Sequence, residues 1–202
     1  MSITVPGLGS GVPPLMAFDY DRTIVGFHGT RVKTARSLVD GKPFDQSTND
    51  DDWLGHGIYF WEFAPRQAWW WAERRYGTDA AVVGSLIRLG RCFDLLDPGN
   101  VNVLATAHDE LNKALTAGGQ PMPGNANNHK YLDCAVFNYM YQSIRLQGYT
   151  LESARAVFVP GGSRLWTRSG VFREAHIQIC VREPDNILAV WPVKKDGRYG
   201  RD

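Results

Sequence analysis

Short runs of β-branched and aromatic residues are separated by helical stretches in an irregular order, and this order limits the folds open to the chain. The strand-like runs cover residues 22–28, 57–61, 80–89, 92–96, 156–159, 176–182 and 187–193. Helical spacing of apolar residues covers 64–76, 100–117 and 131–147, and a shorter helix follows Thr30. The regular strand–helix alternation of a doubly wound sheet is missing. The pattern therefore predicts an α+β fold.

Capping residues define the expected ends of the first two helices. Thr30 is expected to cap the short helix, because its side-chain oxygen can accept a hydrogen bond from a first-turn amide. Gly41 is expected to end that helix, since glycine adopts the left-handed conformation found after many helices. Pro65 suits the first turn of the second helix, where its missing N–H costs nothing.

The length of 202 residues suits one domain and is short for two. Residues 1–20, rich in glycine and proline, are predicted to form an irregular arm, 21–195 a single domain and 196–202 a flexible tail. The first 20 residues lack the basic start of a signal peptide, and no apolar run approaches the ~20 residues that cross a bilayer. We therefore expect a cytoplasmic protein with no membrane partner.

Charge and cysteine content argue against several classes of protein. The 22 basic and 21 acidic residues nearly cancel, which disfavours a surface built for duplex DNA or anionic lipid. The three cysteines are widely spaced without a CxxC pair, which argues against a disulfide framework or a zinc site. The histidines show no metal-ligand spacing, so we expect no metal.

Two motifs favour structural interpretations over functional ones. Residues 7–12 (GLGSGV) resemble a dinucleotide-binding glycine turn, but no strand precedes them and Pro13 and Pro14 stand where a helix must start. Cys134 lies near His129 and Asp133, groups that can activate a thiol, but it falls on the apolar stripe of a helix. We expect an arm in the first case and a buried small hydrophobe in the second.

A third group of residues is more specific. His28 ends a strand and is followed by Gly29, whose bare backbone allows close approach of a ligand. Tyr59 lies in a strand that follows two glycines (LGHGIYF), and the next helix carries Trp69-Trp70-Trp71. Together these groups can clamp a flat polar heterocycle between aromatic faces. The alternative is that the aromatics belong to an ordinary core and His28 is a satisfied residue at a strand end.

These motifs resemble the H-Y-[E/D/Q] branch of the ADP-ribosyltransferases, which includes the poly(ADP-ribose) polymerases and diphtheria toxin. The similarity lies in FHGT, in LGHGIYF about thirty residues later and in the helix that contains Ala68. It covers residues 25–76 well and 172–193 more loosely. The resemblance implies a split pair of small β-sheets around an NAD cleft, with inserted helices.

The resemblance assigns NAD binding to His28, Gly29, Thr30, Tyr59, Gln67 and Trp70. In it His28 holds a ribose hydroxyl, and the Gly29 backbone binds the nicotinamide amide. Tyr59 stacks on nicotinamide, with Trp70 at the spacing of the second stacking aromatic. Gln67 stands where the polymerases have a serine beside the carboxamide, and it keeps a hydrogen-bonding side chain there. With His28 and Tyr59, a residue on a late strand completes the catalytic set.

The position of that third catalytic residue is open between two candidates. Counting back from the turn at 183–186 without gaps places Gln178 on the family's Glu, and the family tolerates Gln there. Glu174 lies four residues earlier on the same strand face, about 13 Å away at ~3.3 Å per residue. His176, between them, can reach the ligand or the target.

The resemblance implies a mono-ADP-ribosyltransferase that consumes NAD as a substrate and transfers ADP-ribose to a protein, RNA or DNA acceptor. Small members of this kind are often toxins or defence effectors, so an antitoxin or immunity protein is a further expected partner. Two alternatives keep the fold: hydrolysis of NAD by water, and RNA 2′-phosphotransfer. A third is a member that binds NAD or a partner without turnover, since the family's Glu is missing at the gapless position.

Overall fold

The computed structural model describes residues 19–126 and 129–195. Its elements in chain order are β1 (Asp19–Arg31), α1 (Val32–Val39), β2 (Ile58–Glu62), α2 (Pro65–Tyr76), β3 (Ala80–Asp94), α3 (Pro98–Ala117), α4 (Tyr131–Leu146), β4 (Ser153–Phe158), β5 (His176–Val181) and β6 (Ile187–Val193). This mixture confirms the α+β class. The predicted tail, and the predicted arm up to residue 18, lie outside the described residues, whereas β1 already begins at Asp19.

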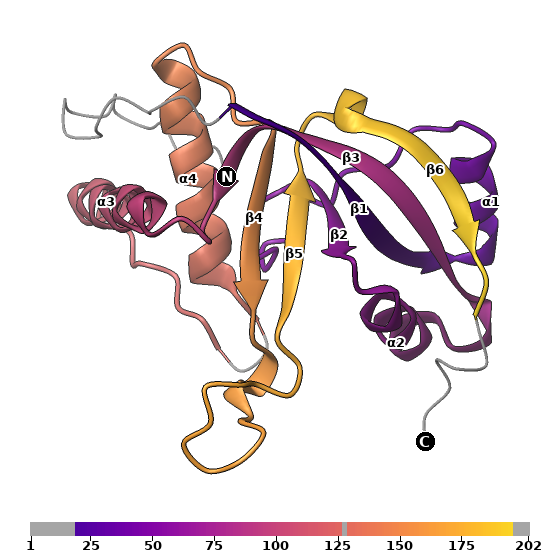
Figure 1. Cartoon of the computed structure of the whole chain (residues 1–202). Helices are drawn as coiled ribbons and strands as arrows, with labels where there is room; N and C mark the ends of the chain where they lie inside the picture. The colour runs from indigo at the N-terminus through magenta and orange to yellow at the C-terminus, as the bar shows by residue number, and fades with distance from the viewer. Residues whose placement is uncertain (1–18, 127–128, 196–202) are drawn as a thin grey trace.

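Within the described residues the six strands form one mixed sheet in the order β1-β2-β5-β4-β3-β6, with an additional pairing of β1 with β3. Only β3 and β4 run parallel among these pairs. The sheet has two three-stranded halves, β6-β3-β1 and β2-β5-β4, which are twisted relative to each other in Figure 1. The halves are joined where Phe27 pairs with Trp61 and where Phe93 pairs with Ala154.

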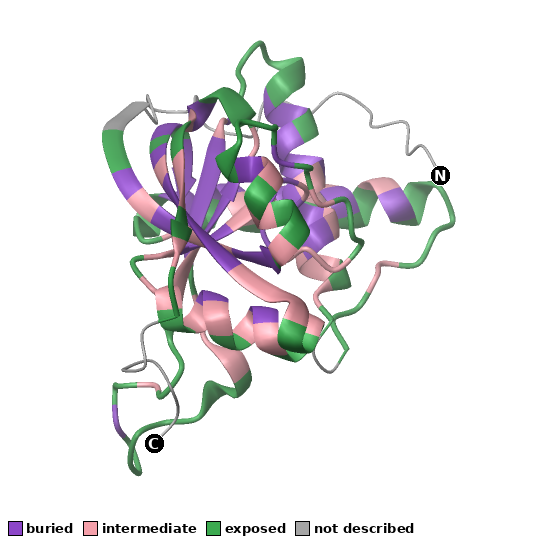
Figure 2. Ribbon diagram, turned by 90° about the vertical axis from the view of Figure 1, so that its right-hand side faces the viewer, coloured by how far each residue is buried: buried purple, intermediate pink, exposed green. Residues whose placement is uncertain are grey.

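Hydrophobic side chains fill the space between the two halves of the sheet. They also cover the sheet faces on which the helices pack. Ile24, Phe60 and Ile179 belong to a fully or nearly buried cluster between the halves. A second cluster packs α3 and α4 against the face of β4 and β5, and these helices lie on the opposite side of the molecule from α1 (Figure 1). Figure 2 shows buried residues concentrated in the strands and on the inner sides of the helices.

Helix α2 lies directly on β1 because the strand has a glycine at the contact. A Cβ atom added at Gly29 would lie 2.7 Å from the carbonyl oxygen of Ala68, which is closer than real contacts allow. Ala68 and Ala72 are fully buried on the same helix face. The small residues therefore set the close approach of α2 to the sheet.

Two predicted element boundaries are wrong for the same reason: β3 is hydrogen-bonded to its neighbouring strands over a longer range than the local sequence indicates. Thr30 does not cap a helix: β1 stays paired with β3 through Arg31, so Thr30 is buried in the strand and Arg31 precedes α1. The predicted strands 80–89 and 92–96 are one strand, because β3 pairs with β1 up to Arg91 and with β4 from Cys92. Helix α1 does end just before Gly41, which has φ 89°, and Pro65 does begin α2.

A buried ion network links three strands in the interior. Arg155 on β4 donates from Nε and Nη2 to the two carboxylate oxygens of Glu62 on β2, at 2.5 and 2.9 Å. Its Nη1 donates to Asp94 on β3 at 3.0 Å. The three side chains are at most 8% exposed, so each charge depends on the others rather than on water.

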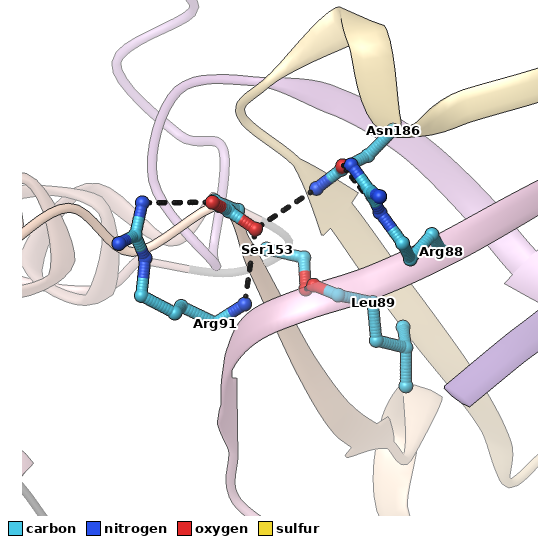
Figure 3. A network of polar contacts seen from close by, with 6 residues as sticks. Arg88, Leu89, Arg91, Ser153 and Asn186 are labelled. Atoms are coloured by element: carbon cyan, nitrogen blue, oxygen red, sulfur yellow. Dashed lines mark hydrogen bonds and ion pairs between the residues drawn. The ribbon is translucent and has the colours of Figure 1, made fainter. Parts of the chain in front are cut away.

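A second polar network joins the ends of β3 and β4 to the turn before β6 (Figure 3). The carboxylate of Glu152 accepts from the backbone N–H and the guanidinium of Arg91 and from the side-chain amide of Asn186. Asn186 accepts in turn from Arg88, and Ser153 donates to the carbonyl of Leu89 at 2.6 Å. Burial by itself raises the pKa of Glu152, but these hydrogen bonds and the Arg91 charge outweigh it and leave the pKa below its ordinary value.

Replacing Glu152 by Gln is expected to destabilise the protein at neutral pH and to matter less in acid. A carboxylate with a lowered pKa stabilises the fold above its unfolded pKa of about 4.5, and that contribution is lost as the pH falls through the folded pKa. The free energy of unfolding of the wild type and of Glu152→Gln, measured by urea denaturation between about pH 7 and pH 3, should converge at the acid end. Glu183→Gln, at an exposed carboxylate, is the matched control. A constant difference across this range would contradict the prediction.

Candidate functional site

A cavity of about 760 Å³ lies between α2, the β2–β5–β4 half of the sheet and the turn that follows β4. Its size suits a nucleotide-sized ligand, since small-molecule sites are typically ~300–1,000 Å³. The residues that line it are Trp61, Gln67, Trp70, Trp71, Arg74, Lys130, Phe158, Val159, Pro160, Gly161, Gly162, His176 and Gln178.

Strand register brings the polar and aromatic sides of the cavity together. Trp61 on β2 is paired with Gln178 on β5, and Phe158 on β4 is paired with His176, so these side chains share one face of the sheet. Helix α2 supplies the opposite wall, on which Gln67 and Trp70 lie one turn apart. Segments distant in the sequence thus meet at one surface.

The cavity combines aromatic surface with positive charge. Three indoles and the Phe158 ring line it, and the guanidinium of Arg74 lies 4.6 Å from the ring centre of Trp70. Lys130, immediately before α4, adds a second cation. None of its lining residues in the described part of the chain is Asp or Glu. This arrangement favours a flat ligand that carries negative charge.

A chain of hydrogen bonds fixes the protonation of His176. Its Nδ1 lies 2.7 Å from the carbonyl oxygen of Glu174, which only accepts, so Nδ1 carries the proton. Nε2 is then free to accept from the amide nitrogen of Gln178 at 3.0 Å. The amide nitrogen of Gln67, 3.1 Å from Nδ1, has no acceptor there. Burial lowers the pKa of His176, against the opposing effects of the Glu174 carbonyl and charge, so the ring is neutral near pH 7.

His28 does not line this cavity. Its ring packs in the core between the sheet halves, 5.4 Å from the ring centre of Phe44 and 5.6 Å from that of Phe60. Nδ1 donates to the carbonyl oxygen of Tyr59 at 2.9 Å, and burial lowers the pKa of the imidazole. His28 and Phe60 lie on the core face because side chains alternate along β1 and β2, which places Phe27 and Trp61 on the other face.

Tyr59 is also absent from the cavity lining. Its hydroxyl accepts from the backbone N–H of Leu54 at 2.9 Å and donates to the carbonyl of Gly55 at 2.8 Å. The ring packs against the cluster under α4, and burial raises the pKa of the phenol well above its ordinary value. The described structure therefore does not bring His28, Tyr59 and Trp70 into one aromatic sandwich.

Of the remaining predicted site residues, some line the cavity and others do not. Gln67, Trp70 and Gln178 line the cavity together. Gly29 is paired with Val82 and covered by α2, and Thr30 is buried in β1. Glu174 is exposed on the turn before β5 and is not among the lining residues, so of the two rivals only Gln178 faces the cavity.

Several lining residues were not expected from the sequence. These are Trp61, Arg74, Lys130, Phe158 and residues 159–162, whereas Trp71 belongs to the tryptophan run that the sequence had singled out. Alternation along β2 could have indicated Trp61, which lies two residues after Tyr59. No local pattern identifies the others, because they reach the site only through the pairing of β4 with β5 and the position of α2.

Further expectations from the sequence concern metal-ligand groups, membrane-spanning helices and the Cys134 thiol. Across residues 19–126 and 129–195, no three His, Cys, Asp or Glu side chains form a group suited to a metal ion. No helix in the same ranges is both long and apolar enough to cross a bilayer. Cys134 is buried and its thiol is free, as the apolar stripe predicted, and burial raises its pKa to about 11.

Comparison with known proteins adds no relative: no family model matches the chain, and no curated protein or solved structure is significantly similar to it.

Proposed function

We propose that this protein is a mono-ADP-ribosyltransferase that cleaves the nicotinamide–ribose bond of NAD. The observation that carries the proposal is that Gln67 and Trp70, which the family resemblance assigns to NAD binding, and Gln178, a candidate for its third catalytic residue, line a single cavity from two separate elements. The family places the NAD cleft between two small sheets, whereas in this chain hydrophobic side chains fill the space between the two halves and the cavity lies between α2 and the β2–β5–β4 half.

The cavity suits NAD in the chemistry of its walls. Nicotinamide and adenine need aromatic faces, which the indoles provide, and the pyrophosphate needs cations, which Arg74 and Lys130 provide. In this proposal Trp61 supplies the stacking surface that the resemblance gives to Tyr59. His28 acts from behind the sheet, through its bond to the Tyr59 carbonyl, by holding β1 against β2.

The reaction breaks the bond between C1′ of the ribose and the nicotinamide nitrogen, and the bonding electrons leave with nicotinamide. An acceptor oxygen or nitrogen then bonds to C1′ and loses its proton. The transition state carries positive charge on the ribose, which a carboxylate stabilises better than an amide does. Gln178 offers only a dipole, so we expect one transfer per acceptor and little chain extension.

Incubation of the purified protein with NAD labelled in the adenylate portion, together with cell lysate, tests the proposal. We expect label in protein, RNA or DNA, together with release of nicotinamide. Label in free ADP-ribose alone would identify a glycohydrolase. Transfer of an RNA 2′-phosphate to NAD would identify the RNA 2′-phosphotransferase alternative. The same lysate, fractionated over the immobilised protein, would reveal any antitoxin or immunity protein.

A second candidate is a member that binds NAD without turnover. It is favoured by one observation, the lack of Asp and Glu among the described lining residues. Calorimetric binding of NAD with no release of nicotinamide would support this candidate over the enzyme. Failure to bind NAD at all would reject both.

A further inference from the structure

Trp53 lies on the loop before β2 and does not line the cavity. It is hydrogen-bonded to Gln178, which does line it. Its indole Nε1 donates to Oε1 of Gln178 at 2.7 Å. An indole N–H only donates, so the atom that faces it must be the amide oxygen. The amide NH₂ of Gln178 is consequently turned toward His176 and the cavity. The Trp53 ring is held in turn by Phe158, with ring centres 5.0 Å apart.

The hydrogen bonds along this chain run in one direction. Trp53 donates to Gln178, Gln178 donates to Nε2 of His176, and Nδ1 of His176 donates to the backbone carbonyl of Glu174. Reversing the Gln178 amide would place its NH₂ against the indole N–H, two donors facing each other. The two ends of the chain, an indole and a carbonyl, therefore fix the orientation of every group between them.

We propose that Trp53 is a positioning residue that holds Gln178 so that the cavity receives an N–H donor rather than a carbonyl oxygen. One amide hydrogen serves His176 and the other is left for a ligand. The group bound there must then be an oxygen acceptor, which a ribose hydroxyl of NAD supplies. This inference rests on the proposed function for the identity of the ligand, but the orientation itself does not.

The orientation makes the site sensitive to protonation of His176. A proton on Nε2 removes the acceptor that Gln178 uses, and the amide can accept from it only by turning its NH₂ toward Trp53. The charge of Glu174, on the turn before β5, acts on the ring, and the cations Arg74 and Lys130 line the same cavity. Gln67 from α2, Gln178 from β5 and Phe158 from β4 also contact the ring and carry no charge.

Trp53→Phe removes the indole N–H and keeps an aromatic ring against Phe158. The amide of Gln178 is then free to turn and accept from protonated His176, so the pKa of His176 should rise in this variant, as followed by NMR of the imidazole Cε1–H. At pH 7, kcat/KM for nicotinamide release should fall about tenfold, the effect of about one net hydrogen bond, and its loss in acid should begin at a higher pH. Trp69→Phe is the matched control, because Trp69 packs against the core under α2 rather than lining the cavity, and its buried Nε1 has no hydrogen-bond partner in the described residues.

The wild type provides a test that needs no folded variant. The indole N–H resonance of Trp53 should titrate with the same midpoint as His176, because the amide between them must respond. Different midpoints, or an unchanged pKa of His176 in a folded Trp53→Phe protein, would overturn the positioning role. If the wild type neither binds nor cleaves NAD while the two resonances titrate together, the proposed function fails. The orientation of the Gln178 amide is then still supported, and its ligand is a different molecule with an acceptor oxygen.

Discussion

Replacing Arg155 by Ala is expected to destabilise the fold by about 3–5 kcal/mol, the usual cost of removing one partner from a buried ion pair. The substitution leaves Glu62 and Asp94 in the interior without the guanidinium that neutralises them. Both carboxylates are then desolvated and repel each other, so one must take up a proton or the strands must separate. Urea denaturation at pH 7 measures the loss directly.

Arg91→Ala is the matched control for this experiment. Arg91 also pairs with a carboxylate, that of Glu152, but its side chain is 50% exposed and water can replace it. We expect a loss of at most about 1 kcal/mol, as for other surface ion pairs. Equal effects of the two substitutions would show that the interior network contributes no more than a surface pair.

Replacing Gln178 by Ala is expected to lower the rate of nicotinamide release from NAD about a hundredfold, the scale of losing one positioned hydrogen-bond donor in an active site. Gln178 is one of two polar residues of β5 that line the cavity, with His176, and its amide is already oriented by Trp53. The assay compares kcat with wild type by following free nicotinamide, after melting curves show matched stability.

Glu174→Ala separates the two candidates for the third catalytic residue. Glu174 is exposed outside the cavity and contacts His176 through its backbone carbonyl, which the substitution keeps. We expect nearly unchanged nicotinamide release. A loss as large as that of Gln178→Ala would move the third catalytic role to Glu174, and mild effects of both would remove β5 from the site.

Local patterns predicted most of the elements because each depends on neighbours in the sequence. Apolar spacing identified the helices at 65–76 and 131–146, and β-branched runs identified β1, β5 and β6. Prediction failed where a long-range partner decided the outcome. Thr30 has the chemistry of a cap, but pairing with β3 holds it in the strand. The start of β4 at Ser153 likewise depends on its partner Cys92.

For the site, local motifs identified the residues that carry usable chemistry: Gln67, Trp70 and Gln178, together with His28 and Tyr59. Which of these residues meet in one cavity depends on how the strands and helices pack. Side chains alternate across a strand, so the pairing of Phe27 on β1 with Trp61 on β2 places His28 on the core face. The Tyr59 hydroxyl is hydrogen-bonded to the backbone of the loop before β2. A motif specifies side chains, whereas strand register and helix docking, set by burial across the whole sheet, specify the face on which each one lies.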